Sequence, residues 1–246
     1  MSEETRIGGL EERACNAWPA LQTVVMDGWL VRFSEGYTKR ANSACALAPG
    51  AAPLERIGPA IEALYGRASL PAIFRLTPLA TAADAAWLAA RGYRPIERTQ
   101  IMTAAADSPS GVDPAIRLSS AAGPDWLAGF AAGNRYGPAV RPTLEKMLAA
   151  IRPEAAFAVL VENGRATAYG LCVIERGIAG LFDILVDEAA RRRGLGRRVV
   201  SSLMAHAAAR GAGEIYLQVM ETNEAARRLY AELGLSDLYA YEYWVV

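Results

Sequence analysis

The 246-residue sequence is poor in several features that mark common protein classes. It contains one histidine and three cysteines, Cys15, Cys45 and Cys172, which are far apart and odd in number. Neither a zinc site nor a disulfide framework is therefore expected, and the cysteines are predicted to be reduced core residues of a cytoplasmic protein. No apolar run reaches transmembrane length, and Met1–Arg6 does not resemble a signal peptide.

Net charge is absent as well. Lysine plus arginine and aspartate plus glutamate number 26 each, so no overall field would attract nucleic acid or an anionic membrane. Hydrophobic residues make up 52% of the chain and the mean hydropathy is +0.11, which is enough for a substantial core. The length fits one large domain or two small ones.

The most informative stretch runs from Leu181 to Leu203. Leu181–Val186 is apolar except for Asp183 and predicts a strand buried on both faces. After a charged connector, Gly194-Leu195-Gly196 opens a predicted helix that ends near Arg210. Glycines at a helix N-terminus let a ligand approach unpaired N–H groups and the positive end of the dipole. Five arginines surround this point: Arg191, Arg192, Arg193, Arg197 and Arg198. The pattern predicts a pyrophosphate site.

Two common nucleotide motifs fit this stretch poorly. A Walker loop requires Gly-x-x-x-x-Gly-Lys-Ser/Thr, and no such lysine is present. A Rossmann fingerprint requires a third small residue where Val199 stands, and glycines that follow the strand directly. Here residues 187–193 intervene between the predicted strand and the glycines.

A third pattern agrees better. Arg191, Gly194 and Gly196 form an Arg-x-x-Gly-x-Gly motif that resembles the cofactor motif of the GCN5-related N-acetyltransferases. Downstream, a predicted strand at 214–219 leads to a predicted helix at 223–235. That helix resembles the family's second motif, Asn-x-x-Ala-x-x-Leu/Phe-Tyr-x-x-x-Gly-Phe, with Leu235 in place of the final Phe. The resemblance covers roughly residues 115–246.

The first half of the chain predicts a second unit. Asp27–Arg32 and Thr38–Leu47 are predicted as paired strands with a turn at Ser34–Gly36. Its order, strand–strand–helix–strand–helix–strand, repeats the order predicted for residues 156–246. We expect a tandem α/β protein, each unit a mixed, mostly antiparallel sheet flanked by helices. A degenerate acetyltransferase-like domain would occupy residues 1–110, and the acetyl-CoA-binding domain residues 111–246, with a linker near 107–113.

The two predicted units differ at the cofactor motif. A local match of Ala85–Tyr93 with Arg227–Leu235 places Leu88 where Tyr230 stands. Pro49–Pro53 occupies the place of the Arg-x-x-Gly-x-Gly motif. The first unit is therefore expected to have lost its cofactor site.

The family resemblance implies roles for particular residues. Main-chain groups of the 184–186 strand would pair with the pantetheine arm, and N–H groups of 191–196 would bind the pyrophosphate. Asn223 would bind the cofactor arm or cap its helix. Tyr230 would be the general acid toward the departing thiolate, with a core aromatic as the alternative. The residues expected to bind the cofactor are Ile184, Leu185, Val186, Arg191, Arg192, Arg193, Gly194, Leu195, Gly196, Arg197, Asn223, Ala226 and Tyr230.

The sequence does not decide which residue is the general base. Asp183 is the acid inside the buried strand, and it would either receive the acceptor's proton through water or make a structural ion pair. Many relatives carry the acid one residue earlier, where Phe182 stands, and a shift of one place reverses the strand face. The reserves are Glu175, Glu221 and Glu242, and His206 is expected to be a packing or surface residue.

The resemblance implies an N-acetyltransferase that moves an acetyl group from acetyl-CoA to an amine by direct attack in a ternary complex. The acceptor would be a small molecule or a peptide, and no metal, nucleic acid or membrane partner is expected. The protein would be a monomer or a homodimer. The alternatives are a non-catalytic acyl-CoA sensor and a dinucleotide-binding oxidoreductase.

Overall fold

A computed structural model describes residues 2–107 and 111–246. The chain forms two compact units. Unit 1 comprises the residues up to Ile101 together with Val219–Asn223 and Leu238–Val246, and unit 2 comprises Met102–Gln218 together with Glu224–Asp237. The division into domains at residue 110 stays a prediction, and the linker predicted near 107–113 falls partly on 108–110, outside the described residues.

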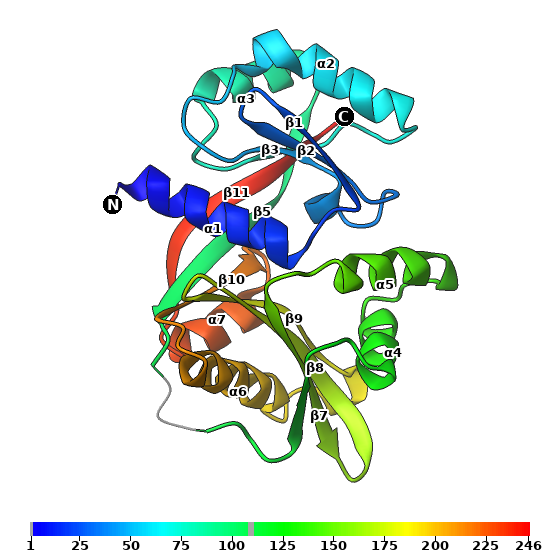
Figure 1. The fold of residues 1–246 in the computed structure, drawn as a ribbon, viewed down its shortest axis with the longest axis vertical. Coiled ribbons are helices and arrows are strands. Elements are labelled where there is room, and N and C mark those ends of the chain that lie inside the picture. The colour runs from blue at the N-terminus through cyan, green and yellow to red at the C-terminus, as the bar shows by residue number, and fades with distance from the viewer. Residues whose placement is uncertain (1, 108–110) are drawn as a thin grey trace. The chain divides into compact units, whose positions relative to one another are not determined.

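Unit 1 contains a sheet with the strand order β1-β2-β3-β4-β11-β5. Neighbouring strands β1–β2, β2–β3 and β4–β11 are antiparallel, and β3–β4 is parallel. Its elements, seen in Figure 1, are α1 (Glu3–Ala17), β1 (Gln22–Met26), β2 (Trp29–Phe33), the 3₁₀ turn η1 (Lys39–Ala41), β3 (Ala44–Ala46), α2 (Leu54–Arg67), β4 (Phe74–Leu76), α3 (Ala82–Ala90), β5 (Arg94–Ala105) and β11 (Ser236–Val245).

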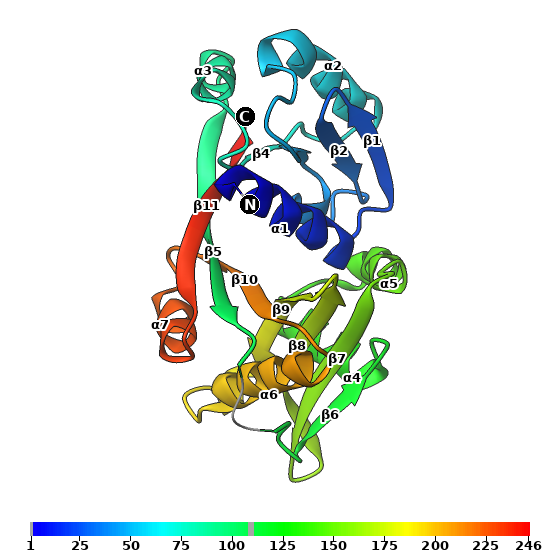
Figure 2. The same ribbon diagram turned by 60° about the vertical axis from the view of Figure 1, so that its left-hand side comes forward.

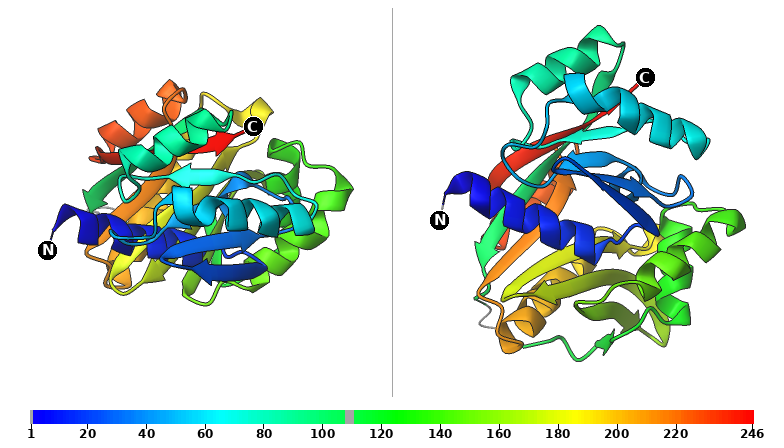
Figure 3. Two further views of the ribbon diagram at one scale, coloured as in Figure 1. Left: turned by 90° about the horizontal axis from the view of Figure 1, so that it is seen from above. Right: turned by 45° about the horizontal axis from the view of Figure 1, so that its top comes forward.

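The helices of unit 1 follow from local sequence. Ser2 caps α1 by accepting a hydrogen bond from the Thr5 N–H at 3.2 Å. Helices α2 and α3 lie side by side (Figure 3), because Gly58 leaves room for the Trp87 ring. A Cβ atom at Gly58 would lie 2.3 Å from that ring, so this glycine is required for helix packing.

The strands predicted at the start of the chain are wrong in part. Asp27 and Gly28 form the turn of the β1–β2 hairpin, with φ values of 45° and 91°, whereas the sequence predicts one strand over Asp27–Arg32. An Asp-Gly pair is the strong signal for such a two-residue turn, because both positions need positive φ. The strand predicted over Thr38–Leu47 is limited to β3, because the 3₁₀ turn η1 precedes it. The chain ends in the single strand β11.

Unit 2 contains a sheet with the order β10-β9-β8-β7-β6, in which β9–β10 is parallel and the other neighbours are antiparallel. Its elements are β6 (Ile116–Ser119), α4 (Pro124–Gly133), the 3₁₀ turn η2 (Pro138–Val140), α5 (Arg141–Ala149), β7 (Glu154–Glu162), β8 (Arg165–Glu175), β9 (Ile178–Val186), the 3₁₀ turn η3 (Glu188–Ala190), α6 (Leu195–Ala209), β10 (Glu214–Met220) and α7 (Glu224–Glu232).

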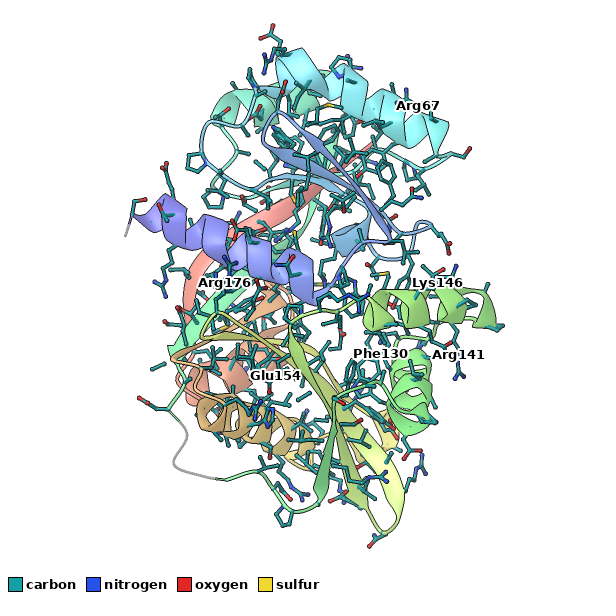
Figure 4. All side chains as sticks on the ribbon, viewed as in Figure 1. Arg67, Phe130, Arg141, Lys146, Glu154 and Arg176 are labelled. Atoms are coloured by element: carbon teal, nitrogen blue, oxygen red, sulfur yellow. The ribbon has the colours of Figure 1, made fainter. Side chains whose placement is uncertain are left out.

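Helices α4 and α6 lie on opposite faces of this sheet (Figures 1 and 2). Tyr169 on β8 packs against Gly129 of α4, and the next residue, Gly170, faces Val199 of α6. Successive strand residues point to opposite faces, so this pair fixes which face each helix covers. On the α4 face, Trp126 stacks on Phe130, which Figure 4 labels, with 4.8 Å between ring centroids.

The predicted α/β class with mixed, mostly antiparallel sheets flanked by helices is confirmed. Strands β7 and β8 form a hairpin, and its turn residues Asn163 and Gly164 both have positive φ. None of the helices among residues 2–107 and 111–246 is long and apolar enough to span a bilayer.

Candidate active site

Strand β9 carries a β-bulge at its centre. Tyr169 pairs with Leu185, and Leu171 pairs with Phe182, so Asp183 and Ile184 together oppose Gly170. Asp183 adopts φ of 54°, in the left-handed region that non-glycine residues rarely visit. A bulge bends its strand and interrupts the alternation of faces. The rule that a shift of one residue reverses the face therefore does not apply at Asp183, which is half-buried.

The bulge coincides with the point where β9 and β10 separate. The parallel pairing runs from Ile178↔Glu214 to Leu181↔Leu217, and among the described residues it goes no further. The edge of β9 from Phe182 to Val186 therefore presents main-chain N–H and C=O groups that β10 does not use. An open strand edge of this kind can pair with an extended ligand.

The side chains on this part of β9 are engaged in packing. Leu185 fills the space over Gly133 of α4, since a Cβ atom there would lie 2.1 Å from the leucine. Ile184 approaches Gly170 on the opposite face, where an added Cβ would lie at 2.9 Å. The predicted cofactor residues on this strand are thus left with their backbone groups for binding.

The strand ends in a loop that leads to the N-terminus of α6. Gly194 stands at the N-cap with φ of 75°, and Arg192 also has a positive φ, 64°. The first hydrogen bond of the helix runs from the Arg198 N–H to the Gly194 carbonyl, at 3.2 Å. Within the described chain, the N–H groups of Leu195, Gly196 and Arg197 have no acceptor. Such N–H groups, at the positive end of the helix dipole, bind anions.

The two glycines of the motif serve different purposes. Gly194 needs the left-handed backbone conformation that glycine adopts without steric cost. A Cβ atom at Gly196 would instead make ordinary contacts, 3.6 Å from Leu229 and 3.7 Å from Val186. Internal packing therefore does not demand glycine at 196. The same contacts show that β9, α6 and α7 converge beside this residue.

Part of the arginine cluster is neutralised by the protein itself. Arg198 binds Asp113 at 2.7 Å and Glu162 at 3.1 Å. Arg193 also binds Glu162, at 2.9 Å. These carboxylates hold both guanidinium groups and reduce the positive charge left for a ligand.

The remaining arginines differ in whether their side chains already have a partner within the protein. Arg197 forms an ion pair with Glu232 of α7, and Arg191 donates from Nε to the Val186 carbonyl at 3.4 Å. Arg192 is exposed and has no hydrogen bond or ion pair within the described residues. Arg191 and Arg192 are therefore the cations that remain available at the α6 N-terminus.

Tyr230 lies on α7 and is 7% exposed. Burial raises the pKa of its phenol to about 12, which keeps the hydroxyl protonated at neutral pH. Ala226 lies one helical turn earlier and is half-buried. Asn223 precedes the helix and is exposed, and its main-chain N–H donates to the Met220 carbonyl at 2.9 Å. Its cofactor and capping roles stay predictions.

Other titratable residues considered in the sequence occupy different surroundings. Glu221 and Glu242 both bind Arg98, at 3.6 and 3.0 Å, and Glu175 lies 3.3 Å from Arg176, labelled in Figure 4. Burial lowers the pKa of His206, which lies in the second half of α6. Among residues 2–107 and 111–246, no group of three or more His, Cys, Asp or Glu side chains is arranged to hold a metal.

Two cavities in unit 2 are not lined by residues of the open strand edge, Phe182–Val186. The larger, about 710 Å³, lies between α4, α5 and β7 and is lined in part by Leu127, Leu148 and Phe157. The smaller, about 280 Å³, adjoins the loop before α6 and includes Arg193. An extended ligand on a strand edge requires a groove, so the β9 edge and the α6 N-terminus define the candidate site.

Sequence reasoning missed the residues that complete this arrangement. Leu229 lines the space beside Gly196, and its place before Tyr230 in the second motif was the available signal. Glu162 and Asp113 lie 36 and 85 residues from Arg198, and no local pattern connects them.

Residues 4–244 match the family model described as "Probable histone acetyltransferase Rv0428c C-terminal". The chain is 28% identical over 242 residues to the uncharacterized N-acetyltransferase YobR of Bacillus subtilis, covering 95% of this chain and 96% of that protein. It is also 35% identical over 78 residues to the [ribosomal protein bS18]-alanine N-acetyltransferase of Escherichia coli, which covers 32% of this chain and 53% of that protein.

Solved structures share the fold. A GCN5-related N-acetyltransferase from Kribbella flavida aligns with a TM-score of 0.69 at 16% identity, over 97% of this chain and 95% of the other. A tandem acetyltransferase from the clavulanic acid biosynthesis pathway aligns with a TM-score of 0.58 at 16% identity, over 83% of this chain and 74% of the other. The chain has the fold of the GCN5-related N-acetyltransferases, and since the family model spans nearly the whole sequence, it belongs to this family of N-acetyltransferases.

Proposed function

We propose that this enzyme transfers the acetyl group of acetyl-CoA to an amine by direct attack within a ternary complex. The observation that carries the proposal is the open edge of β9 from Phe182 to Val186, which leads to the unpaired N–H groups of Leu195–Arg197. An extended ligand that carries amide groups followed by a pyrophosphate matches these two features in the same order: its amides fit the strand edge, and its pyrophosphate fits the helix N-terminus.

The residues present fit acetyl-CoA. The two amides of the pantetheine arm are suited to main-chain groups on the β9 edge. The pyrophosphate is suited to the α6 N-terminus, where Gly196 keeps the backbone accessible and Arg191 and Arg192 supply positive charge. The thioester of this cofactor supplies an activated acetyl group.

Tyr230 acts on the leaving group in this proposal. Its phenol stays protonated at neutral pH because burial raises its pKa to about 12. A thiol, with a pKa of about 8.5, is a stronger acid than this phenol. A hydrogen bond from Tyr230 to the developing thiolate therefore stabilises it, and complete proton transfer is not needed for departure.

Asp183 is the proposed proton acceptor for the amine, acting through water. It lies at the bulge, where β9 separates from β10, and its side chain is half-buried. The competing role is structural support of the bulge. Asp183→Asn separates the two: loss of a base lowers kcat more as pH falls, whereas loss of a structural contact lowers thermal stability at all pH values.

The acceptor class rests on relatives. The E. coli relative is named for acetylating an alanine of a ribosomal protein, and the family model is named for a histone acetyltransferase. Both names point to protein amino groups, so peptides with free α-amino groups and with lysine are the first acceptors to test, followed by small amines. Unit 1 is proposed to be a degenerate acetyltransferase-like half.

Turnover distinguishes this enzyme from a non-catalytic acyl-CoA sensor. The purified protein is incubated with acetyl-CoA and each acceptor, and both thiol release and the acetylated acceptor are measured. Tyr230→Phe serves as the reduced-activity variant, and Tyr136→Phe on the α4–α5 connection serves as the matched control. Acceptor-dependent acetylation supports the proposal; acetyl-CoA binding without turnover on any amine supports the sensor.

A further inference from the structure

The larger cavity of unit 2 has the size and composition of a small-molecule site. Its volume of about 710 Å³ lies within the range of about 300–1,000 Å³ that such sites occupy. Helices α4 and α5 and the start of β7 surround it. Apart from Ser120, Arg141, Glu145 and Glu154, every residue that lines the cavity is apolar.

The floor of the cavity belongs to the packed core of unit 2. Phe157 on β7 and Leu148 on α5 are 3% and 7% exposed, and both line the cavity. The Trp126 ring of α4 packs edge-on against Phe157, with 5.1 Å between ring centroids, and its Nε1–H donates to the Gly170 carbonyl at 3.0 Å. The apolar surface is therefore formed before any ligand arrives, which lowers the cost of binding.

The charged side chains that line the cavity already have partners within the protein. Arg141 and Glu145 form an ion pair within α5, at 2.7 Å. Glu154 accepts a hydrogen bond from Arg210, at the end of α6, at 2.5 Å. Arg141 and Glu154 are both labelled in Figure 4. Because each pair is neutral, neither pair strongly favours a ligand of one charge.

A cation beside the cavity has no such partner. Arg152 is exposed and forms no hydrogen bond or ion pair with any residue of 2–107 or 111–246. It lies between Ile151 and Pro153, which both line the cavity. Asp125, at the start of α4, is paired with Arg117 at 2.7 Å and does not offset this charge. The charge left for a ligand at this end of the cavity is therefore positive.

Charge complementarity indicates the class of ligand. A carboxylate would pair with Arg152 through the two parallel N–H···O bonds that a planar guanidinium favours. An ammonium group would instead meet an unpaired cation and two carboxylates that are already paired. An apolar body would gain free energy by covering Leu148, Ile151 and Phe157.

We propose that this cavity is a binding site for a small apolar carboxylic acid. Its carboxylate pairs with Arg152, and its aromatic or aliphatic body packs against Leu148, Ile151 and Phe157. The site is additional to the proposed acetyl-CoA site and does not depend on it.

The strand register separates this site from the open edge of β9. Glu154 pairs with Ile174 of β8, and Ile174 pairs with Ala179 of β9. Ala179 lies in the part of β9 that pairs with β10, before the open edge at Phe182–Val186 begins. A ligand whose carboxylate binds Arg152, next to the start of β7, therefore leaves that edge free.

The experiment is an NMR titration of the full-length protein with 3-(indol-3-yl)propionate and with tryptamine, which share an indole body and differ in charge. Acetyl-CoA is left out, so the result stands apart from the proposed acetyl transfer. We expect the carboxylate to bind with a dissociation constant of about 1 mM or lower and to shift the amide signals of Leu148, Ile151 and Phe157. Tryptamine should bind about 5-fold more weakly. No shifts at these residues up to about 10 mM carboxylate, or equal binding of tryptamine, would overturn the proposal.

A charge variant tests the role of Arg152. Arg152→Gln should weaken the carboxylate about 5-fold and leave the affinity for tryptamine within about 2-fold. The matched control is Arg67→Gln on α2, labelled in Figure 4, because Arg67 is also exposed and has no partner in the described chain. An equal loss in both variants, or no loss in Arg152→Gln, would contradict the assignment of the carboxylate.

A filling variant tests the cavity itself. Ala149 is exposed on α5 and lines the cavity, so Ala149→Trp should occupy the space and weaken the carboxylate at least about 10-fold. Ala128→Trp on α4 is the control, because Ala128 is exposed and does not line the cavity. Unchanged affinity in a folded Ala149→Trp protein would place the ligand elsewhere and overturn the proposal. If Ala149→Trp does not fold, the wild-type shifts and the Arg152→Gln comparison decide.

Discussion

Helix α2 of unit 1 and helix α6 of unit 2, which the proposed repeat would place in correspondence, differ in how the N–H groups at their N-termini are bonded. The first amide of α2, at Leu54, donates to the Asp84 carboxylate at 2.7 Å. At α6, the N–H groups of Leu195–Arg197 have no acceptor within the described residues. Unit 1 thus supplies an anion from its own chain, whereas the helix N-terminus in unit 2 is the one at which we propose that a ligand binds.

The difference extends to the following helix. Tyr230 on α7 provides a protonated phenol, whereas the aligned position in α3 is Leu88, which is fully buried. Asp84 itself lies on α3, where it also accepts from Thr81 in a capping box. In this account, the helices of unit 2 would serve the proposed cofactor, whereas those of unit 1 serve structural stability.

The largest expected effect is on kcat, and it distinguishes α7, which carries Tyr230, from α3, which carries Leu88. Tyr230→Phe removes the leaving-group donor and should lower kcat about 100-fold with little change in the KM for acetyl-CoA. Leu88→Met conserves volume at the aligned position and should leave kcat unchanged. Steady-state kinetics of both variants test this, and an equal loss in both would contradict the comparison.

The same phenol sets a pH dependence. Because the pKa of Tyr230 is raised to about 12, the donor is lost only as pH rises through that value. The kcat profile should therefore show no decline between about pH 8 and pH 10, the range in which an ordinary tyrosine begins to ionise. A falling limb near pH 10 in the wild type that is absent in Tyr230→Phe would show that the phenol has an ordinary pKa.

The next largest effect is on stability and concerns Asp84, the carboxylate at the N-terminus of α2. Asp84→Ala removes the acceptor for Leu54 and for Thr81 and should lower the free energy of unfolding by about 2 kcal/mol. Acetyl-CoA affinity should be unchanged, because this carboxylate belongs to unit 1. Urea unfolding and calorimetry measure the two quantities, and weakened cofactor binding in a folded Asp84→Ala protein would argue against the division of roles.

The smallest effect distinguishes two neighbouring arginines. Arg192→Gln removes the unpaired cation and should weaken acetyl-CoA binding about 5-fold, with a shallower salt dependence. Arg193→Gln removes a cation already bound to Glu162 and should change affinity less than about 2-fold. Titrations at low and high salt check both, and a larger effect at Arg193 would show that its ion pair opens for the ligand.

Local sequence was sufficient for much of the fold and the site. The helix after Gly194 depends on this nearby glycine and begins where the sequence predicts it. Asp27-Gly28 also carries a local turn signal, but the alternation that follows it favours a strand, so the two signals in the sequence conflict and the structure has the turn.

Other features depend on contacts that the sequence does not display. The bulge at Asp183 is a relation between two strands, so a single strand pattern could not reveal it. The carboxylate partners of Arg193 and Arg198 are distant from them in the sequence, and the sequence alone does not distinguish these carboxylates from several others. The arginine cluster therefore looked more strongly charged in the sequence than it is in the folded protein.

The most direct test of the open α6 N-terminus is calorimetric titration of acetyl-CoA, with NAD and ATP in parallel, into the wild type, Gly196→Trp and the control Gly66→Trp. Gly66 lies exposed near the end of α2, with no atom within 4 Å of an added Cβ. We expect selective acetyl-CoA binding by the wild type and the control, and its loss in Gly196→Trp with the fold intact. Unchanged acetyl-CoA binding in a folded Gly196→Trp protein, or selective binding of NAD or ATP, would contradict the assigned site.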